Sequence, residues 1–224
     1  FRDARDLLAQ AERVYPYSAD VQYLMARVRS GLNDDAGAGA AMVRAVGLAP
    51  LYIDPAFDKV RLGAASRQAA LLTLGWSLYY AGDAVAAEKR LREYATAGGK
   101  DATGTTGLGW ALIAQGKAAD AGTAFRAAWQ SGADAQAGLG WSLLAAGNIA
   151  EAESSFKTAL KTTSGYASAQ SGLAAVQYRK TALVKDGWDA YYRGDYDKAL
   201  REFEARIDEA ARAGNPSAQD GRGW

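Results

Sequence analysis

The segment LGWSLLAAGNIAEAESSF, from Leu139 to Phe156, carries the pattern that decides the fold. The same frame recurs in three further segments of the chain. In each copy, an apolar stretch with helical spacing runs to a Gly, and a second such stretch follows. The copies are LGWSLYYAGDAVAAEKRL from Leu74, LGWALIAQGKAADAGTAF from Leu108 and DGWDAYYRGDYDKALREF from Asp186. The pattern predicts a helical hairpin repeated along the chain.

Two sets of glycines recur in this frame, and each implies a different backbone requirement. The glycines between the two apolar stretches are expected to end the first helix in the left-handed conformation: Gly82, Gly116, Gly147 and Gly194. The glycine of each Gly-Trp pair lies inside the first helix, where it costs about 1 kcal/mol relative to Ala. We expect this cost to be offset by close approach of a small residue of the second helix: Ala87, Ala121, Ala152 or Ala199. A fifth Gly-Trp pair is Gly223-Trp224.

This frame resembles the tetratricopeptide repeat (TPR) family. Its marks are Leu-Gly in the first helix, a Gly turn, and Ala followed by Phe in the second helix. The best-matching copy has them at Leu108, Gly109, Gly116, Ala121 and Phe125. The resemblance implies an all-α fold, a right-handed α-solenoid of antiparallel helix hairpins.

The spacing of the copies predicts how the chain is divided. We expect an N-terminal TPR-like block over 1–50, a connecting segment over 51–66 and the main array over 67–169. Residues 170–224 should hold a long helix and the last repeat. A gap of 47 residues separates Trp141 from Trp188, and it favours one unbroken helix between Tyr166 and Arg193. The alternative is a break between Arg179 and Val184. The start at Phe1 and the lack of capping segments predict an array that continues in a longer protein.

Composition excludes several classes of function. The 224 residues include no Cys and no His, which excludes Ser-His-Asp and Cys-His catalysis and thiolate or imidazole metal sites. We therefore expect no enzyme, no metal and no cofactor. Lys and Arg total 26 against 25 Asp and Glu, a balance that argues against nucleic-acid binding. No apolar run is long enough to span a membrane. The absence of Cys slightly favours a bacterial periplasm over the cytoplasm, and the compartment stays open.

The Trp of each Gly-Trp pair is the main candidate for binding. By the family resemblance, its position faces the concave groove of the superhelix. Residues three and four positions later share its helix face, so aromatic platforms are expected around Trp76 and Trp188. The candidate binding residues are Trp76, Tyr79, Tyr80, Trp110, Ile113, Trp141, Leu144, Trp188, Tyr191 and Tyr192.

Three interpretations of these residues stay open. The aromatic groove could hold a partner protein or peptide. The rings could instead stack on glycan, as in a bacterial polysaccharide synthesis or export assembly. The Trp residues could also serve only to pack neighbouring repeats together. The charged clamp by which some members of the family hold a carboxylate is not expected, because Thr106 and Ala137 occupy its Lys position. Self-association through the ends of the array is a further possibility.

Overall fold

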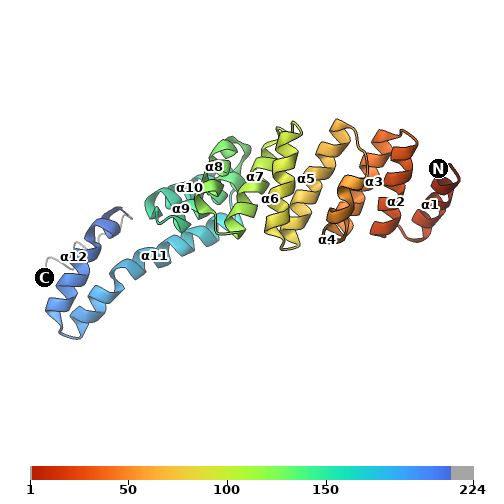
Figure 1. The fold of residues 1–224 in the computed structure, drawn as a ribbon. Helices are drawn as coiled ribbons and strands as arrows, with labels where there is room; N and C mark the ends of the chain where they lie inside the picture. The colour runs from red at the N-terminus through yellow and green to blue at the C-terminus, as the bar shows by residue number, and fades with distance from the viewer. Residues whose placement is uncertain (1, 213–224) are drawn as a thin grey trace. The chain divides into compact units, whose positions relative to one another are not determined.

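The computed structural model describes residues 2–212, and within this range all regular structure is helical (Figure 1). The predicted all-α class of helix hairpins is therefore confirmed. The fifth Gly-Trp pair, Gly223-Trp224, lies outside the described residues. The chain separates into two compact units, the first ending at Lys117 and the second beginning at Ala118.

Unit 1 contains the N-terminal hairpins and the first Gly-Trp hairpin. Each helix is followed by a short turn and packs beside the next one along the chain (Figure 1). The helices are α1 (Arg2–Val14), α2 (Ala19–Gly31), α3 (Asp35–Leu48), α4 (Pro50–Ile53), the 3₁₀ helix η1 (Asp54–Lys59), α5 (Ala64–Tyr80), α6 (Ala84–Thr96) and α7 (Ala102–Ala114).

Unit 2 contains the last two Gly-Trp hairpins, preceded by α8, and the longest helix of the described range. Its helices are α8 (Ala118–Ala127), the 3₁₀ helix η2 (Trp129–Ser131), α9 (Ala133–Ala145), α10 (Ile149–Thr162), α11 (Ala167–Tyr192) and α12 (Tyr196–Arg212). Helix α11 runs for 26 residues without interruption. The long helix expected from the repeat spacing is confirmed, and the alternative break between Arg179 and Val184 does not occur.

The turn glycines have the backbone conformation that the sequence predicts. Gly82, Gly116, Gly147 and Gly194 have φ angles of 88°, 75°, 82° and 82°. L-residues rarely adopt this region, whereas Gly adopts it without steric cost. At the first of these turns the following residue, Asp83, caps α6 by accepting a hydrogen bond of 2.9 Å from the amide of Ala86. One Gly-Asp pair thus ends one helix and begins the next.

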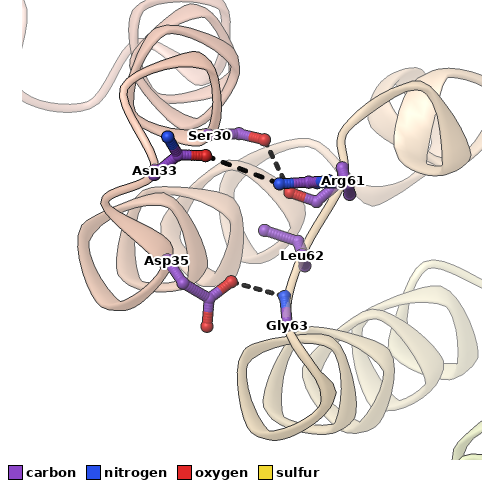
Figure 2. Close-up of a pocket in the computed structure, with 6 residues that line it drawn as sticks. All are labelled: Ser30, Asn33, Asp35, Arg61, Leu62 and Gly63. Atoms are coloured by element: carbon purple, nitrogen blue, oxygen red, sulfur yellow. Dashed lines mark hydrogen bonds between the residues drawn. The ribbon is translucent and has the colours of Figure 1, made fainter.

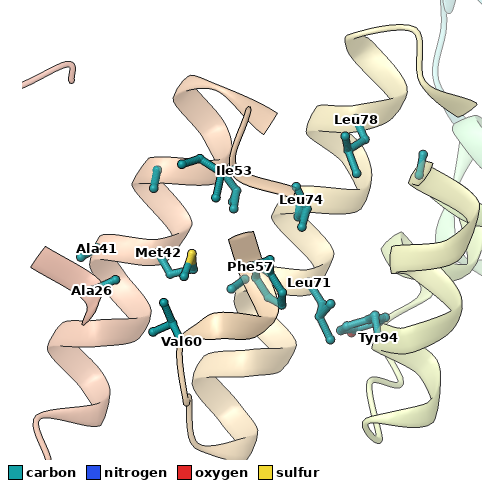
Figure 3. Close-up of a cluster of buried hydrophobic side chains, with 14 of the residues drawn as sticks. Ala26, Ala41, Met42, Ile53, Phe57, Val60, Leu71, Leu74, Leu78 and Tyr94 are labelled. Atoms are coloured by element: carbon teal, nitrogen blue, oxygen red, sulfur yellow. The ribbon is translucent and has the colours of Figure 1, made fainter. Parts of the chain in front are cut away.

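The segment expected to be a connection, residues 51–66, is part of the core of unit 1. Ile53 and Phe57 are 1% and 0% exposed and belong to the same buried cluster as Met42 and Leu74 (Figure 3). That cluster extends from α2 to α7. The core is therefore continuous from the N-terminal hairpins into the first Gly-Trp hairpin.

A buried cation fastens this segment to α6. Arg90 is 2% exposed, and its guanidinium lies 5.1 Å from the centre of the Phe57 ring. It donates to Asp54 at 2.6 Å, to Asp58 at 2.9 Å and to Glu93 at 2.7 Å. Burial alone would lower the pKa of Arg90, but the three carboxylates outweigh it and raise the pKa above its usual value. Asp54 is thus paired by a charge from α6, and Asp58 is paired by Arg90 of α6 and by Arg67 of α5.

The glycines of the Gly-Trp pairs accommodate a large side chain of their own second helix. A Cβ atom at Gly140 would lie 2.6 Å from the Phe156 ring, and one at Gly187 would lie 2.6 Å from the Phe203 ring. At Gly75 the nearest atom belongs to Leu91, again at 2.6 Å.

The expectation that Ala87, Ala121, Ala152 and Ala199 make this close approach was therefore wrong where the contact is described. At Gly75, Gly140 and Gly187 the nearest atoms belong to the residue four positions after the Ala. The alanines themselves are buried. The physical reason is reach, because a ring or a branched chain extends across to the backbone of the first helix whereas a methyl group does not.

Phe156 makes a second contact of this kind with the next hairpin. A Cβ atom at Gly172, on α11, would lie 2.3 Å from the same ring. The Phe156 ring is thus bracketed by glycine backbones of α9 and α11. One side chain therefore holds its own hairpin together and attaches the hairpin that follows.

We predict that Gly140→Ala destabilises the protein even though Ala is the better helix former by about 1 kcal/mol. The added methyl would overlap the Phe156 ring, and overpacking of this kind costs about 1–3 kcal/mol. Urea unfolding followed by circular dichroism measures the change. The matched control is Gly47→Ala in α3, where a Cβ atom would meet nothing within 4 Å. That variant should be unchanged or more stable, and equal loss of stability in both variants would contradict the bracketing role.

We also predict a large difference between two arginines of α6. Arg90→Met removes the buried guanidinium and its bonds to Asp54, Asp58 and Glu93, and it should lower the free energy of unfolding by about 2 kcal/mol. Arg92→Met removes a side chain that is 57% exposed and pairs with Glu88, so it should cost only about 0.5 kcal/mol. Thermal unfolding of the two variants beside the wild type tests this. Similar midpoints for the two variants would show that the Arg90 cluster does not stabilise unit 1.

Candidate functional site

The first aromatic platform, which we call the Trp76 platform, consists of Trp76, Tyr79 and Tyr80 on α5. The Trp76 and Tyr80 rings are stacked, with centroids 5.7 Å apart and an interplanar angle of 24°. Tyr79 meets Trp76 edge-on, with centroids 5.9 Å apart. Tyr80 is 76% exposed, whereas Trp76 and Tyr79 are half-buried. The structure therefore brings these three predicted residues together and leaves the outer ring open.

Trp76 also packs against the first helix of the next hairpin. A Cβ atom at Gly107 of α7 would lie 2.8 Å from its indole ring, so the indole lies directly against the α7 backbone. The indole nitrogen is buried, and it has no hydrogen-bond acceptor within the described residues. Trp76 thus performs the packing role that the sequence left open, while its other side supports the exposed Tyr80.

The second platform, the Trp188 platform, consists of Trp188, Tyr191 and Tyr192 on α11. It repeats the same geometry: Trp188 stacks on Tyr192 with centroids 5.9 Å apart and an interplanar angle of 28°. Tyr191 meets Trp188 edge-on at 5.7 Å. Tyr192 is 78% exposed. The same spacing on two different helices therefore produces the same stacked pair with an exposed outer tyrosine.

Tyr196, at the start of α12, enlarges the Trp188 platform and was not among the predicted residues. Its ring meets Tyr191 edge-on at 5.6 Å and it is 65% exposed. The signal available in the sequence was an aromatic residue two positions after the turn glycine Gly194. Beneath the platform, the Phe203 ring lies 5.2 Å from Trp188.

The middle hairpins present much less aromatic surface. Trp141 donates from its indole nitrogen to the Ser168 hydroxyl of α11 at 3.0 Å, and its ring meets Phe156 edge-on. Leu144 is only 6% exposed, and Trp110 and Ile113 are half-buried on α7. Of the predicted residues, Trp141 and Leu144 therefore contribute mainly to packing in unit 2.

A carboxylate on α6 fixes the end of α7 close to the Trp76 platform. Glu88 accepts hydrogen bonds from Lys117 and Gln115, each at 2.8 Å, and from Arg92. The hydrogen bond from Lys117 is the main reason that the pKa of Glu88 falls to about 2. Burial opposes this shift, and Gln115 and Arg92 add to it. Glu88 thereby holds the first helix against which Trp76 packs.

A polar pocket of about 340 Å³ lies between the α2–α3 turn and the chain before α5 (Figure 2). Its polar groups are paired within the protein: Ser30 donates to the Arg61 carbonyl at 2.6 Å, and Asp35 accepts from the Gly63 amide. The bond from Gly63 is the main cause of the lowered pKa of Asp35. These bonds explain how residues 61–63 are attached to α2 and α3. The lining residues are Ser30, Asn33, Asp35, Arg61, Leu62 and Gly63.

Among the described residues, no group of three or more Asp, Glu, His or Cys side chains is arranged to hold a metal ion. None of the helices between residues 2 and 212 is both long and apolar enough to cross a membrane.

Comparison with known proteins identifies a family and similar solved structures. A family model described as tetratricopeptide repeat matches residues 72–137 and 137–186, which together make up just over half of the chain. The crystal structure of YrrB, described as a TPR protein with an unusual peptide-binding site, is 18% identical with a TM-score of 0.43. That match covers 92% of this chain and 93% of the other. No curated protein matches the sequence.

We predict that Glu88 makes stability depend on pH in acid. The pKa of this carboxyl is 4.5 without its partners and about 2 in the folded protein. Its contribution is therefore present above pH 4.5 and is lost as the pH falls towards 2, because the unfolded chain binds the proton first. Urea unfolding between pH 5 and pH 2 should show a shallower dependence for Glu88→Gln than for the wild type. Lys117→Met, which removes the main cause of the shift, should flatten the curve in the same direction. An unchanged slope in both variants would contradict this assignment.

Proposed function

The chain belongs to the tetratricopeptide repeat family, and on this premise we propose that it is a non-catalytic interaction scaffold. Its partner is a protein or peptide that contacts the exposed aromatic rings of the first helices. The contact residues are Tyr80 with Trp76 and Tyr79 in unit 1, and Tyr192 with Trp188 and Tyr191 in unit 2. Each platform can contact a partner by itself, so the proposal does not require the two platforms to form one site.

The observation that carries this proposal is the stacked and exposed tyrosine of each platform. Tyr80 and Tyr192 are 76% and 78% exposed, although each ring is held in place by a tryptophan. A tyrosine held in this way offers a large flat surface and a hydroxyl group while losing little conformational entropy on binding. Aromatic residues are enriched among those that dominate binding energy at protein interfaces.

The groups with strongly shifted pKa values support a non-catalytic role. The pKa of Arg90 is raised by carboxylates that attach the residue 54–58 segment to α6. The pKa of Glu88 is lowered by Lys117, which attaches α7 to α6. Active sites usually place such groups where substrate can reach them. Here the shifts arise from ion pairs that join helices.

We predict that Tyr80→Ala combined with Tyr192→Ala removes partner binding while leaving the fold intact. Proteins captured from a lysate of the source organism by the wild type and by the variant would be compared by quantitative mass spectrometry. Whichever platform holds the partner, loss of its outer ring should weaken binding by about 2–4 kcal/mol, enough to abolish capture.

The matched control is Tyr178→Ala on α11, which removes a tyrosine that is 74% exposed and lies outside both platforms. Capture should be unchanged in this variant. Circular dichroism spectra and unfolding midpoints should agree among all three proteins. A partner captured equally by wild type and double variant would place the binding surface elsewhere.

A further inference from the structure

Most of α5, which carries the Trp76 platform, and all of α7 contain no charged residue. Residues 68–82 of α5 and its turn contain no Asp, Glu, Lys or Arg, and neither do residues 102–116 of α7. The second helix between them, α6, contains Glu88, Lys89, Arg90, Arg92 and Glu93. Charges in this part of unit 1 thus lie on α6, in the turns and at Arg67 near the start of α5. We call the uncharged surface along α5 and α7 the neutral face.

The neutral face is continuous across the two helices because Trp76 bridges them. Its indole lies against Gly107 of α7, and its other side supports Tyr80. Thr73 and Ser77 flank Trp76 on α5, and both are half-exposed. The Thr73 hydroxyl donates to the Ala69 carbonyl of its own helix at 3.0 Å. The surface therefore offers rings, small side chains and hydroxyl groups.

Three of the charged residues near the ends of the neutral face make contacts within unit 1. Asp83 accepts from the Ala86 amide at 2.9 Å, and Asp101 accepts from the Thr103 amide at 2.8 Å. Lys117 pairs with Glu88 at 2.8 Å. Asp83 and Asp101 thus cap α6 and α7, Lys117 pairs with Glu88, and all three lie outside residues 68–82 and 102–116.

From these observations, and resting on the proposed function, we infer that the neutral face binds an uncharged, apolar segment of the partner protein. A charged side chain placed here would lose hydration without gaining a counter-charge. An apolar side chain would instead be stabilised by the removal of its surface from water. The segment stacks its aromatic or aliphatic side chains on Tyr80 and Trp76, and its affinity is independent of salt.

The Trp188 platform provides a comparison within the same chain. Its aromatic geometry is nearly the same, but charged residues surround it, and an adjacent pocket on α11 and α12 is lined by Asp186, Asp189, Arg193, Asp195, Lys198 and Glu202. Binding at that platform is expected to depend on ionic strength. Because the two platforms share their ring geometry but differ in the surrounding charge, a difference in the salt dependence of binding between them can be assigned to charge.

The test uses the whole chain as bait for a displayed library of random twelve-residue peptides. Peptides are kept if they bind the wild type and fail to bind Tyr80→Ala. We expect these peptides to contain fewer charged residues than the unselected library. Their Kd, measured by fluorescence anisotropy, should change less than about twofold between 50 mM and 500 mM NaCl, because exposed charge pairs are strongly screened over this range.

Three other outcomes separate this inference from the proposed function. Peptides that depend on Tyr80 but are rich in charge and lose affinity in salt would overturn the inference about the neutral face. They would remain consistent with the proposed function as an interaction scaffold. If no peptide depends on Tyr80 or Tyr192, the proposed function fails together with the inference. Neutral linear glucan oligosaccharides could instead change the tryptophan fluorescence in a Tyr80-dependent way while no peptide binds. That result would overturn the inference and identify the ligand of this face as a glycan.

A second pair of variants tests the charge argument directly. Thr73→Lys and Thr73→Glu each place a charge beside Trp76, and each should weaken a selected peptide at least about tenfold, since either sign must be desolvated. The control is Thr96→Lys on α6, which adds the same charge to the exposed surface of a second helix. It should leave Kd unchanged. Tighter binding for one sign at Thr73 would show that the peptide carries the opposite charge and would overturn the inference.

Discussion

The repeat depends on a ring inserted between glycine backbones. Phe156 lies so close to Gly140 and Gly172 that neither position could take a Cβ atom without a shift of the structure. Phe203 meets Gly187 in the same way, and Leu91 meets Gly75. In a solenoid each hairpin is stabilised mainly by its neighbours, so a contact that joins two consecutive hairpins decides the stability of both. The helix propensity lost at each glycine is the cost of letting the helices approach the ring.

The composition of the first helices follows from this contact. A helix that must present glycine to rings on either side has few positions for long side chains. The residue after the glycine, the Trp, lies about 100° further round the helix and reaches the next hairpin, as Trp76 reaches Gly107. The residue four positions later returns to the same side of the helix as the Trp and stacks on its outer surface. Packing therefore determines where an exposed aromatic ring can be held rigidly.

The sequence predicts most of the fold because its signals are local. The turn glycines, the hairpins and the uninterrupted α11 all follow from spacing. The side chain that packs on each buried glycine could not be predicted from spacing. Periodicity identifies which side of the second helix faces the first, but not which side chain on it is long enough to reach the glycine. The segment 51–66 resembled a connection because it carries Asp54, Pro55 and Asp58. It folds into the core since Arg90, more than thirty residues away in sequence, pairs with both carboxylates.

In the candidate site too, contacts within one helix could be predicted from the sequence, whereas contacts between helices could not. Both aromatic platforms were predictable, because residues three and four apart on one helix must meet. Tyr196 was missed because it comes from another helix, and the burial of Leu144 depends on how unit 2 packs.

Under the proposed function, the Trp76 platform would join binding to packing. Trp76 contacts Gly107 on one side and Tyr80 on the other. A segment that stacks on Tyr80 therefore presses on the ring that connects α5 to α7, and its binding energy acts on the contact between two hairpins. A partner bound here would reinforce the array as well as occupy it.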